Sequence, residues 1–202
     1  MPELFGTTRR EFLARLSSLG VAWAVPFDVQ ARDKLPQRQI PGSGESLPII
    51  GLGSTKPVRQ IPTTGTEPLA NVIRMLRSYG GSVVDTSPRA IEIDTEFGRV
   101  LQIPEFHESL FVAAKVTATG KDEGIAQFRQ TQRLFGRPTV DLVQISSLTD
   151  LSTHWPSLQS WKDESAARYI GVTVSHERLY EQLESFMRHE SPDFIQVNYS
   201  VV

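Results

Sequence analysis

The sequence predicts an α/β fold with a parallel sheet, built either as a barrel or as a doubly wound sheet. Its apolar runs are short, rich in Val and Ile, and continuous rather than alternating, which is typical of strands buried on both faces. Helix-like segments separate these runs, and repeated strand–helix units favour parallel strands. The strand-like runs are residues 47–53, 82–87, 109–116, 140–146, 169–174 and 193–202.

Three of the intervening segments carry clear helix signals. In 66–80, 122–136 and 175–190, apolar residues recur three or four positions apart, as they do on one face of a helix. The first pattern stops at Gly80 and the second at Gly136, and glycine commonly follows the last turn of a helix. We therefore expect helices between the first and second, third and fourth, and fifth and sixth strands.

Composition restricts the possible functions of this 202-residue chain, for which one domain is the default. Its 39% hydrophobic and 22% charged residues are ordinary for a globular protein. A net charge of −2 argues against a sequence-independent nucleic-acid binder. The sequence has no apolar run of about 18 residues, so we expect no membrane span. It also has no cysteine, which excludes disulfides and thiolate metal sites, and no metal site is predicted.

The N-terminus carries a possible export signal. Residues 8–13, "TRREFL", form a twin-arginine pattern, and a moderately apolar stretch with small residues follows. The pattern resembles the twin-arginine signal of bacterial export, which implies a periplasmic or exported protein. The alternative is an amphipathic helix with two surface arginines, in which case the protein stays in the cytoplasm. We expect a signal segment at 1–31, a linker at 32–46 and the folded domain at 47–202.

Polar residues stand at the carboxyl ends of several predicted strands. Asp85 ends the second strand and Lys115 ends the third, while Ser146, Thr173 and Gln196 lie late in the following three. Ligands of parallel α/β proteins bind at this end of the strands. A buried charge is costly unless it is paired, so we expect Asp85 and Lys115 to pair. The pair could serve a ligand site, or it could be a purely structural salt bridge.

From about residue 40 onward the sequence resembles the aldo-keto reductases, and most of all their exported subgroup. The matching stretches are "LPIIGLGS", "VVDTSP", "FVAAKV", "DLVQIS", "YIGVTVS" and "FIQVNYS", in this order. The resemblance implies a (β/α)8 barrel, truncated here after about six βα units, that uses NADPH to reduce an aldehyde or ketone. The doubly wound alternative ranks lower, because "GLGSTKP" lacks the full spacing of a dinucleotide-binding turn.

The resemblance also implies which residues would act in catalysis. Asp85 and Lys115 match the family's aspartate and lysine. The family's tyrosine, which donates a proton to the new alkoxide, is replaced by Ala90, and its histidine is replaced by Ser146. Because Ala90 has no proton to give, we expect weak activity or none. His154 is the candidate for a substitute acid, although a histidine in this position more often packs near the start of a helix.

For the cofactor, the resemblance implies that Gly53, Ser54, Thr173 and Gln196, together with Asp85, approach the nicotinamide half of NADP. The family's site for the adenosine phosphate lies in later strands, and we expect it to be absent from this chain. Two open sheet edges would invite self-association. The alternatives to a reductase are a non-catalytic binding protein built on part of a barrel and a truncated remnant.

Overall fold

The computed structural model describes residues 34–53 and 56–199. The predicted signal segment, residues 1–31, lies outside the described residues, and so does Ser54. Within the described ranges, no helix has the length and apolar character needed to cross a membrane.

The centre of the fold is a curled parallel sheet, as the sequence predicts. Five strands follow one another in space in the same order as in the chain, and every neighbouring pair is parallel. This arrangement is that of a partial (β/α)8 barrel, because each strand of such a barrel pairs with the next in sequence. The strands are β3 (Val83–Asp85), β4 (Phe111–Val116), β5 (Val140–Ser146), β6 (Ala167–Val174) and β7 (Phe194–Val197).

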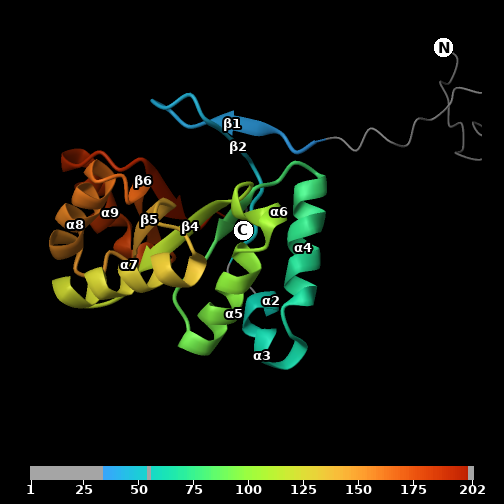
Figure 1. Ribbon diagram of the computed structural model, residues 1–202. Helices are drawn as coiled ribbons and strands as arrows, with labels where there is room; N and C mark the ends of the chain where they lie inside the picture. The colour runs from blue at the N-terminus through green and yellow to red at the C-terminus, as the bar shows by residue number, and fades with distance from the viewer. Residues whose placement is uncertain (1–33, 54–55, 200–202) are drawn as a thin grey trace, which may run out of the picture. The chain divides into compact units, whose positions relative to one another are not determined.

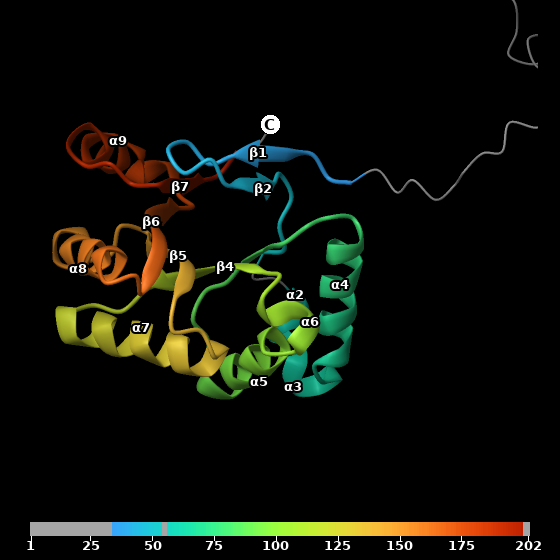
Figure 2. The same cartoon turned by 45° about the horizontal axis from the view of Figure 1, so that its top comes forward.

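Helices alternate with these strands and cover the convex side of the sheet (Figures 1 and 2). Three of them, α4, α7 and α9, confirm the helices predicted in 66–80, 122–136 and 175–190. In the described residues the helices are α2 (Lys56–Arg59), α3 (Ile61–Thr64), α4 (Glu67–Ser78), α5 (Ile91–Leu101), α6 (Pro104–His107), α7 (Lys121–Phe135), α8 (Leu151–Asp163), η1 (Glu177–Leu179) and α9 (Tyr180–His189).

The first predicted strand, 47–53, does not form one continuous strand. Its beginning belongs to β2 (Ser46–Pro48), which pairs antiparallel with β1 (Gln37–Gln39) in the segment predicted to be a linker. Pro48 has no N–H with which to continue a ladder. Four residues later the chain returns to the main sheet, where Leu52 forms an isolated parallel bridge with Val84. The sheet therefore has five strands and one bridged position.

The β1–β2 hairpin is tied to the amino-terminal end of β6. The Tyr169 hydroxyl donates a hydrogen bond of 2.7 Å to the Glu45 carboxylate, and Arg168 forms an ion pair with the same carboxylate. Ile40, between β1 and β2, is buried. The hairpin thus covers one end of the sheet and leaves the carboxyl ends of the strands for other contacts.

Two apolar cores pack on opposite faces of the sheet. The larger one fills the space between the convex face and the helices. The smaller one lies on the concave face, where the rings of Phe111 and Tyr169 meet that of Phe194 at centroid distances of 6.1 and 5.5 Å. β6 and β7 approach closely at Gly171, because a Cβ atom there would lie 2.2 Å from the carbonyl oxygen of Phe194. The concave core therefore packs next to the side chains at the carboxyl ends of the strands.

Candidate functional site

Strand alternation carries Lys115 onto the concave face. In β4, Val112 and Val116 belong to the convex core, whereas Phe111 and Ala113 belong to the concave core. Side chains of a strand point alternately to the two faces, so Lys115 continues the concave row. It stands at the carboxyl end of that row, above the apolar core.

The same alternation gathers the other predicted site residues on this face. Asp85 pairs in register with Ala113, Thr173 with Ser146, and Gln196 with Thr173. Val174, by contrast, is part of the convex core. Each of the five strands therefore places at least one polar side chain on the concave face toward the mouth of the partial barrel, and the predicted ones are Asp85, Lys115, Ser146, Thr173 and Gln196.

Asp85 and Lys115 form the ion pair that the sequence predicts. The Lys115 ammonium lies 2.6 Å from each oxygen of the Asp85 carboxylate. Only 7% of the lysine side chain and 20% of the aspartate side chain are exposed. Because an unpaired buried charge is strongly unfavourable, each of these two charges needs the other to offset the cost of its desolvation. The pair fixes an ammonium group at the mouth.

A cavity of about 360 Å³ opens beside this pair. Its wall is mostly apolar and includes Val83, Phe111 and Leu142 from the concave core. Asp85 and Gln196 supply polar groups, and the Gln196 amide donates a hydrogen bond of 3.2 Å to the Asp85 carboxylate. An apolar cavity with a few polar groups at one end is the usual form of a small-molecule site.

Ala90 and Ser146 occupy the positions at which the sequence resemblance expects a tyrosine and a histidine. Ala90 is an exposed residue that precedes α5, with φ −55° and ψ 140°. Ser146 is half-buried at the end of β5. Neither side chain is an acid of useful strength near neutral pH. Gly53 is half-buried directly after the Leu52 bridge, on the side of β3 that leads to the mouth.

The loop after β5 holds an unusual backbone next to the mouth. Ser147, Leu148 and Asp150 all have positive φ angles, of 54°, 55° and 43°. Non-glycine residues rarely adopt this conformation, and such strain is concentrated at functional sites. The Asp150 carboxylate accepts a hydrogen bond of 2.8 Å from the backbone N–H of Gly120, which ties the loop to the start of α7.

His154 lies away from the cavity. It is buried in α8, with its ring against Gly124 of α7, and its Nε2 donates a hydrogen bond of 2.9 Å to the carbonyl oxygen of Ala118. The ring is 1% exposed, so a substrate cannot reach it. The packing interpretation of this histidine is the one that the geometry supports.

Sequence reasoning missed Arg89 and Asp94, which lie in the loop after β3 and in the first turn of α5. The Arg89 guanidinium donates hydrogen bonds of 3.0 Å to the hydroxyl of Thr86 and to the carbonyl oxygen of Ser87. Its backbone N–H donates to the Asp94 carboxylate at 2.8 Å. Burial raises the pKa of the Asp94 carboxyl, although these contacts with Arg89 oppose the shift. The sequence feature that could have drawn attention to these residues is an arginine in the loop that follows Asp85.

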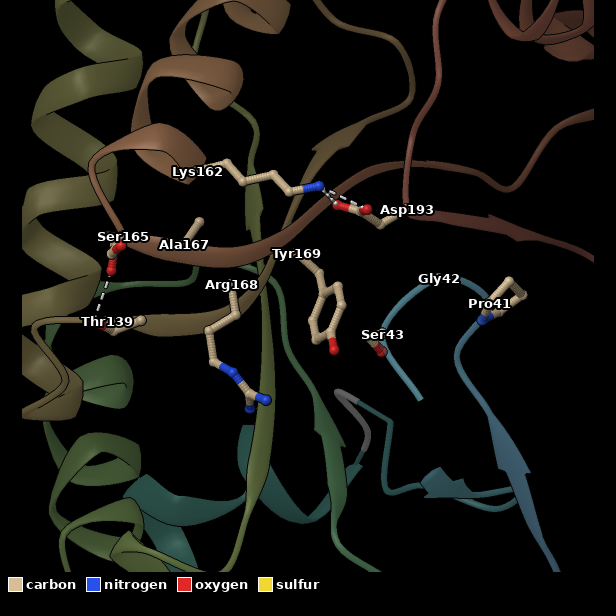
Figure 3. Close-up of a pocket in the computed structure, with 10 residues that line it drawn as sticks. All are labelled: Pro41, Gly42, Ser43, Thr139, Lys162, Ser165, Ala167, Arg168, Tyr169 and Asp193. Atoms are coloured by element: carbon tan, nitrogen blue, oxygen red, sulfur yellow. Dashed lines mark hydrogen bonds and ion pairs between the residues drawn. The ribbon is translucent and has the colours of Figure 1, made fainter. Parts of the chain in front are cut away.

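A larger cavity, of about 580 Å³, lies at the opposite end of the sheet (Figure 3). It is bordered by the hairpin turn around Gly42 and by the start of β6. Its lysine, Lys162, already forms two hydrogen bonds of 2.7 Å with Asp193, and Arg168 is paired with Asp141. The amino-terminal end of such a sheet generally serves stability rather than catalysis. The smaller cavity, which Asp85 and Gln196 help to line, is therefore the better candidate.

Comparison with known proteins identifies the fold. No protein-family model matches the chain, and no curated protein matches it either. Solved structures do match. A Pseudomonas aeruginosa protein provisionally named an aldo-keto reductase shares 18% identity at a TM-score of 0.69, with 87% of this chain and 72% of that structure covered.

Two further matches are aldo-keto reductases of known cofactor state. The Bacillus halodurans enzyme in its holo form aligns at a TM-score of 0.67 and 15% identity, covering 83% of this chain and 59% of that structure. The Bombyx mori enzyme in complex with NADP aligns at a TM-score of 0.62 and 18% identity, covering 82% of this chain and 59% of that structure. Identities this low establish a common fold and no more. The described part of the chain therefore has the fold of the aldo-keto reductases, in the form of a partial (β/α)8 barrel.

Proposed function

We propose that this protein belongs to the aldo-keto reductases, that it binds NADP(H) at the mouth of the partial barrel, and that it reduces a small aldehyde or ketone weakly or not at all. The observation that carries the proposal is the buried Lys115–Asp85 pair on the concave face, with Ala90 in the loop that follows β3. Further support comes from the fold and from similar structures solved with NADPH or NADP.

The polar groups at the mouth suit the nicotinamide half of the cofactor. The Gln196 amide and the Thr173 hydroxyl can bind a carboxamide, and Gly53 leaves room at the side next to β3. NADPH, when bound, supplies a hydride. In this proposal Lys115 contributes a positive charge close to the reacting carbonyl, and Asp85 keeps its ammonium in place. Ser54 completes the proposed site from outside the described residues.

Protonation of the product is where activity would fail. Reduction of a carbonyl leaves an alkoxide, which needs a proton from a nearby acid. Ala90 has none, and the Ser146 hydroxyl is too weak an acid to replace it. Loss of general-acid catalysis costs about 100- to 10,000-fold in rate. Binding of the cofactor is expected to survive this loss, because the retained groups serve binding.

The test is NADPH binding by the full chain, followed through the emission of NADPH itself. Tryptophan emission is a poor reporter here, because Trp155 and Trp161 lie on α8 in the convex core. We expect saturable binding that Lys115→Met weakens about tenfold or more, the effect of one charged hydrogen bond. Lys162→Met is the matched control, since it breaks an ion pair of 2.7 Å at the other end of the sheet. Absence of binding by well-folded protein would overturn the proposal.

The second candidate is a non-catalytic binding protein that retains the barrel mouth. The exposed, non-acidic Ala90 favours it. NADPH binding without turnover on any of a panel of aldehydes would support this candidate over a weak reductase. Two further expectations remain proposals, namely export through the signal in residues 1–31 and self-association through open edges of the sheet.

A further inference from the structure

Gln144 is a polar residue of the concave face that the proposed reaction does not use. It lies on β5 two positions after Leu142 of the concave core, so strand alternation places its side chain on the same face. Its register partner on β4 is Lys115. Only 2% of Gln144 is exposed, and the residue lines the cavity of about 360 Å³. The cavity wall therefore contains a buried amide, on the strand next to the one that carries Lys115.

The protein satisfies the Gln144 amide only in part. Its Nε2 donates a long hydrogen bond of 3.5 Å to the carbonyl oxygen of Val172. This contact favours the orientation described, because exchange of the amide nitrogen and oxygen would bring two oxygens together. Within residues 34–53 and 56–199, no donor forms a hydrogen bond with Gln144 Oε1. Since buried polar atoms normally have a partner, this oxygen calls for a donor from a molecule in the cavity.

Gln196 brings a second amide oxygen to the same cavity. Its Nε2 donates to the Asp85 carboxylate at 3.2 Å, and the exchanged orientation would place its oxygen against a negative charge. No donor in the described part of the chain forms a hydrogen bond with Gln196 Oε1. Asp85 itself also lines the cavity, and its carboxylate only accepts hydrogen bonds. Two amide oxygens and a carboxylate favour a ligand that donates a hydrogen bond, and they disfavour an anion.

The rest of the wall is apolar and partly aromatic. The rings of Phe111 and Phe194 lie on it, with their centroids 6.1 Å apart and their planes tilted by 44°. Aromatic rings pack well on one another in tilted and edge-to-face arrangements. The cavity volume of about 360 Å³ is near the lower limit of small-molecule sites, which is about 300 Å³. The wall therefore suits a ligand built on a single apolar ring.

We propose that this cavity binds a neutral ligand with an apolar ring and a hydroxyl group, which donates a hydrogen bond to Gln144 Oε1. This inference rests on the proposed function, of which it names the substrate class: an aldehyde or ketone that also carries a hydroxyl group. The hydroxyl gives the buried oxygen its missing partner, and the ring packs against Phe111 and Phe194. A carboxylate in the place of the hydroxyl would be repelled by Asp85.

Phenol and fluorobenzene provide a matched pair of probes, because they have nearly the same shape and only phenol donates a hydrogen bond. Fluorobenzene is titrated into the full chain without cofactor and followed by its fluorine NMR signal. Phenol and benzoate are then measured as competitors. We expect phenol to bind about fivefold more tightly than fluorobenzene, the effect of one neutral hydrogen bond. Benzoate should bind more weakly than phenol.

Gln144→Leu keeps the approximate size of the side chain and removes its oxygen. This variant should reduce the phenol-to-fluorobenzene affinity ratio from about five to about one. The midpoint of urea unfolding should not fall, because replacing a poorly satisfied buried polar group by an apolar one is nearly neutral or stabilising. A purely structural glutamine would give the opposite result, namely a lower midpoint and an unchanged ratio. The control is Gln130→Leu, which removes an exposed amide from α7 and should leave the ratio unchanged.

The outcomes separate this inference from the proposed function. No binding of phenol, equal affinity for phenol and fluorobenzene, tighter binding of benzoate, or an unchanged ratio in Gln144→Leu would overturn the hydroxyl assignment, even if NADPH binds. A phenol preference that depends on Gln144, in a protein that fails to bind NADPH, would keep the hydroxyl site and overturn the reductase proposal. The affinity ratio of the wild type remains a test if Gln144→Leu does not fold.

Discussion

The Gln196 side chain on β7 donates a hydrogen bond of 3.2 Å to the Asp85 carboxylate on β3, which joins the two edge strands of the sheet across its mouth. These residues are 111 positions apart in the chain. Asp85 thereby accepts hydrogen bonds from both Gln196 and Lys115. A single carboxylate therefore contacts the Lys115 ammonium and also links the first and last strands of the sheet at the proposed cofactor site.

Removal of this bridge should affect both stability and binding. We expect Gln196→Ala to lower the free energy of unfolding by about 1 kcal/mol and to weaken NADPH binding, because the amide is lost from the mouth. The control is Asn198→Ala, which removes a hydrogen bond of 2.6 Å to the carbonyl oxygen of Ser175. It should cost similar stability in urea unfolding but leave NADPH affinity unchanged. Equal loss of affinity in both variants would contradict a specific role for Gln196.

The two lysine–aspartate pairs should differ in their contribution to stability. Lys115→Met leaves Asp85 as a largely buried charge without its main partner, which typically costs about 3–5 kcal/mol. Lys162→Met breaks a pair of nearly the same length, but 40% of the lysine side chain is exposed, and such pairs contribute about 0–1 kcal/mol. Urea unfolding of both variants measures the difference. Similar midpoints would show that the Lys115 pair is not desolvated as the structure indicates.

A tyrosine at position 90 should supply a general acid and raise turnover. Ala90 is exposed and has an ordinary extended backbone, so a larger side chain can be accepted there. If the mouth binds NADPH as proposed, Ala90→Tyr should raise the rate of aldehyde reduction about 100- to 10,000-fold. Ala90→Phe adds the same ring without the hydroxyl. Equal rates in the two variants, measured by NADPH oxidation with 4-nitrobenzaldehyde, would show that the phenol is not what the site lacks.

The sequence was a good guide to the strands that the sheet buries on both faces. Residues 140–146 form β5 as predicted, because their apolar side chains serve both cores. The run 47–53 failed as a single strand. It contains Pro48, and its Ile49 and Ile50 remain about half exposed, with 54% and 52% accessible. Apolar composition alone could not reveal that this run is divided between a hairpin and a single bridge.

The candidate site was predictable in part. Alternation along a strand was enough to bring Asp85 and Lys115 to one face, because their carboxyl-terminal positions fix where they lie. Arg89 and Asp94 depend instead on how the loop before α5 folds back on itself, through the hydrogen bond from the Arg89 N–H to the Asp94 carboxylate. A local sequence pattern does not encode the burial that raises the pKa of Asp94.

The raised pKa of Asp94 predicts an unusual dependence of stability on pH. Burial is its main cause, and the hydrogen bond and charge of Arg89 oppose it. Between the ordinary value of 3.8 and the higher folded value, the folded state binds more protons at this group than the unfolded state does. Stability must therefore fall through this pH window as pH rises, whereas a salt-bridged carboxylate would make stability rise with pH.

The variant Asp94→Asn tests this prediction, because it retains an oxygen for the Arg89 N–H but cannot ionise. In urea unfolding from about pH 3 to about pH 7, the variant should gain stability relative to the wild type as pH increases. Parallel pH profiles for the two proteins would contradict the assigned pKa shift.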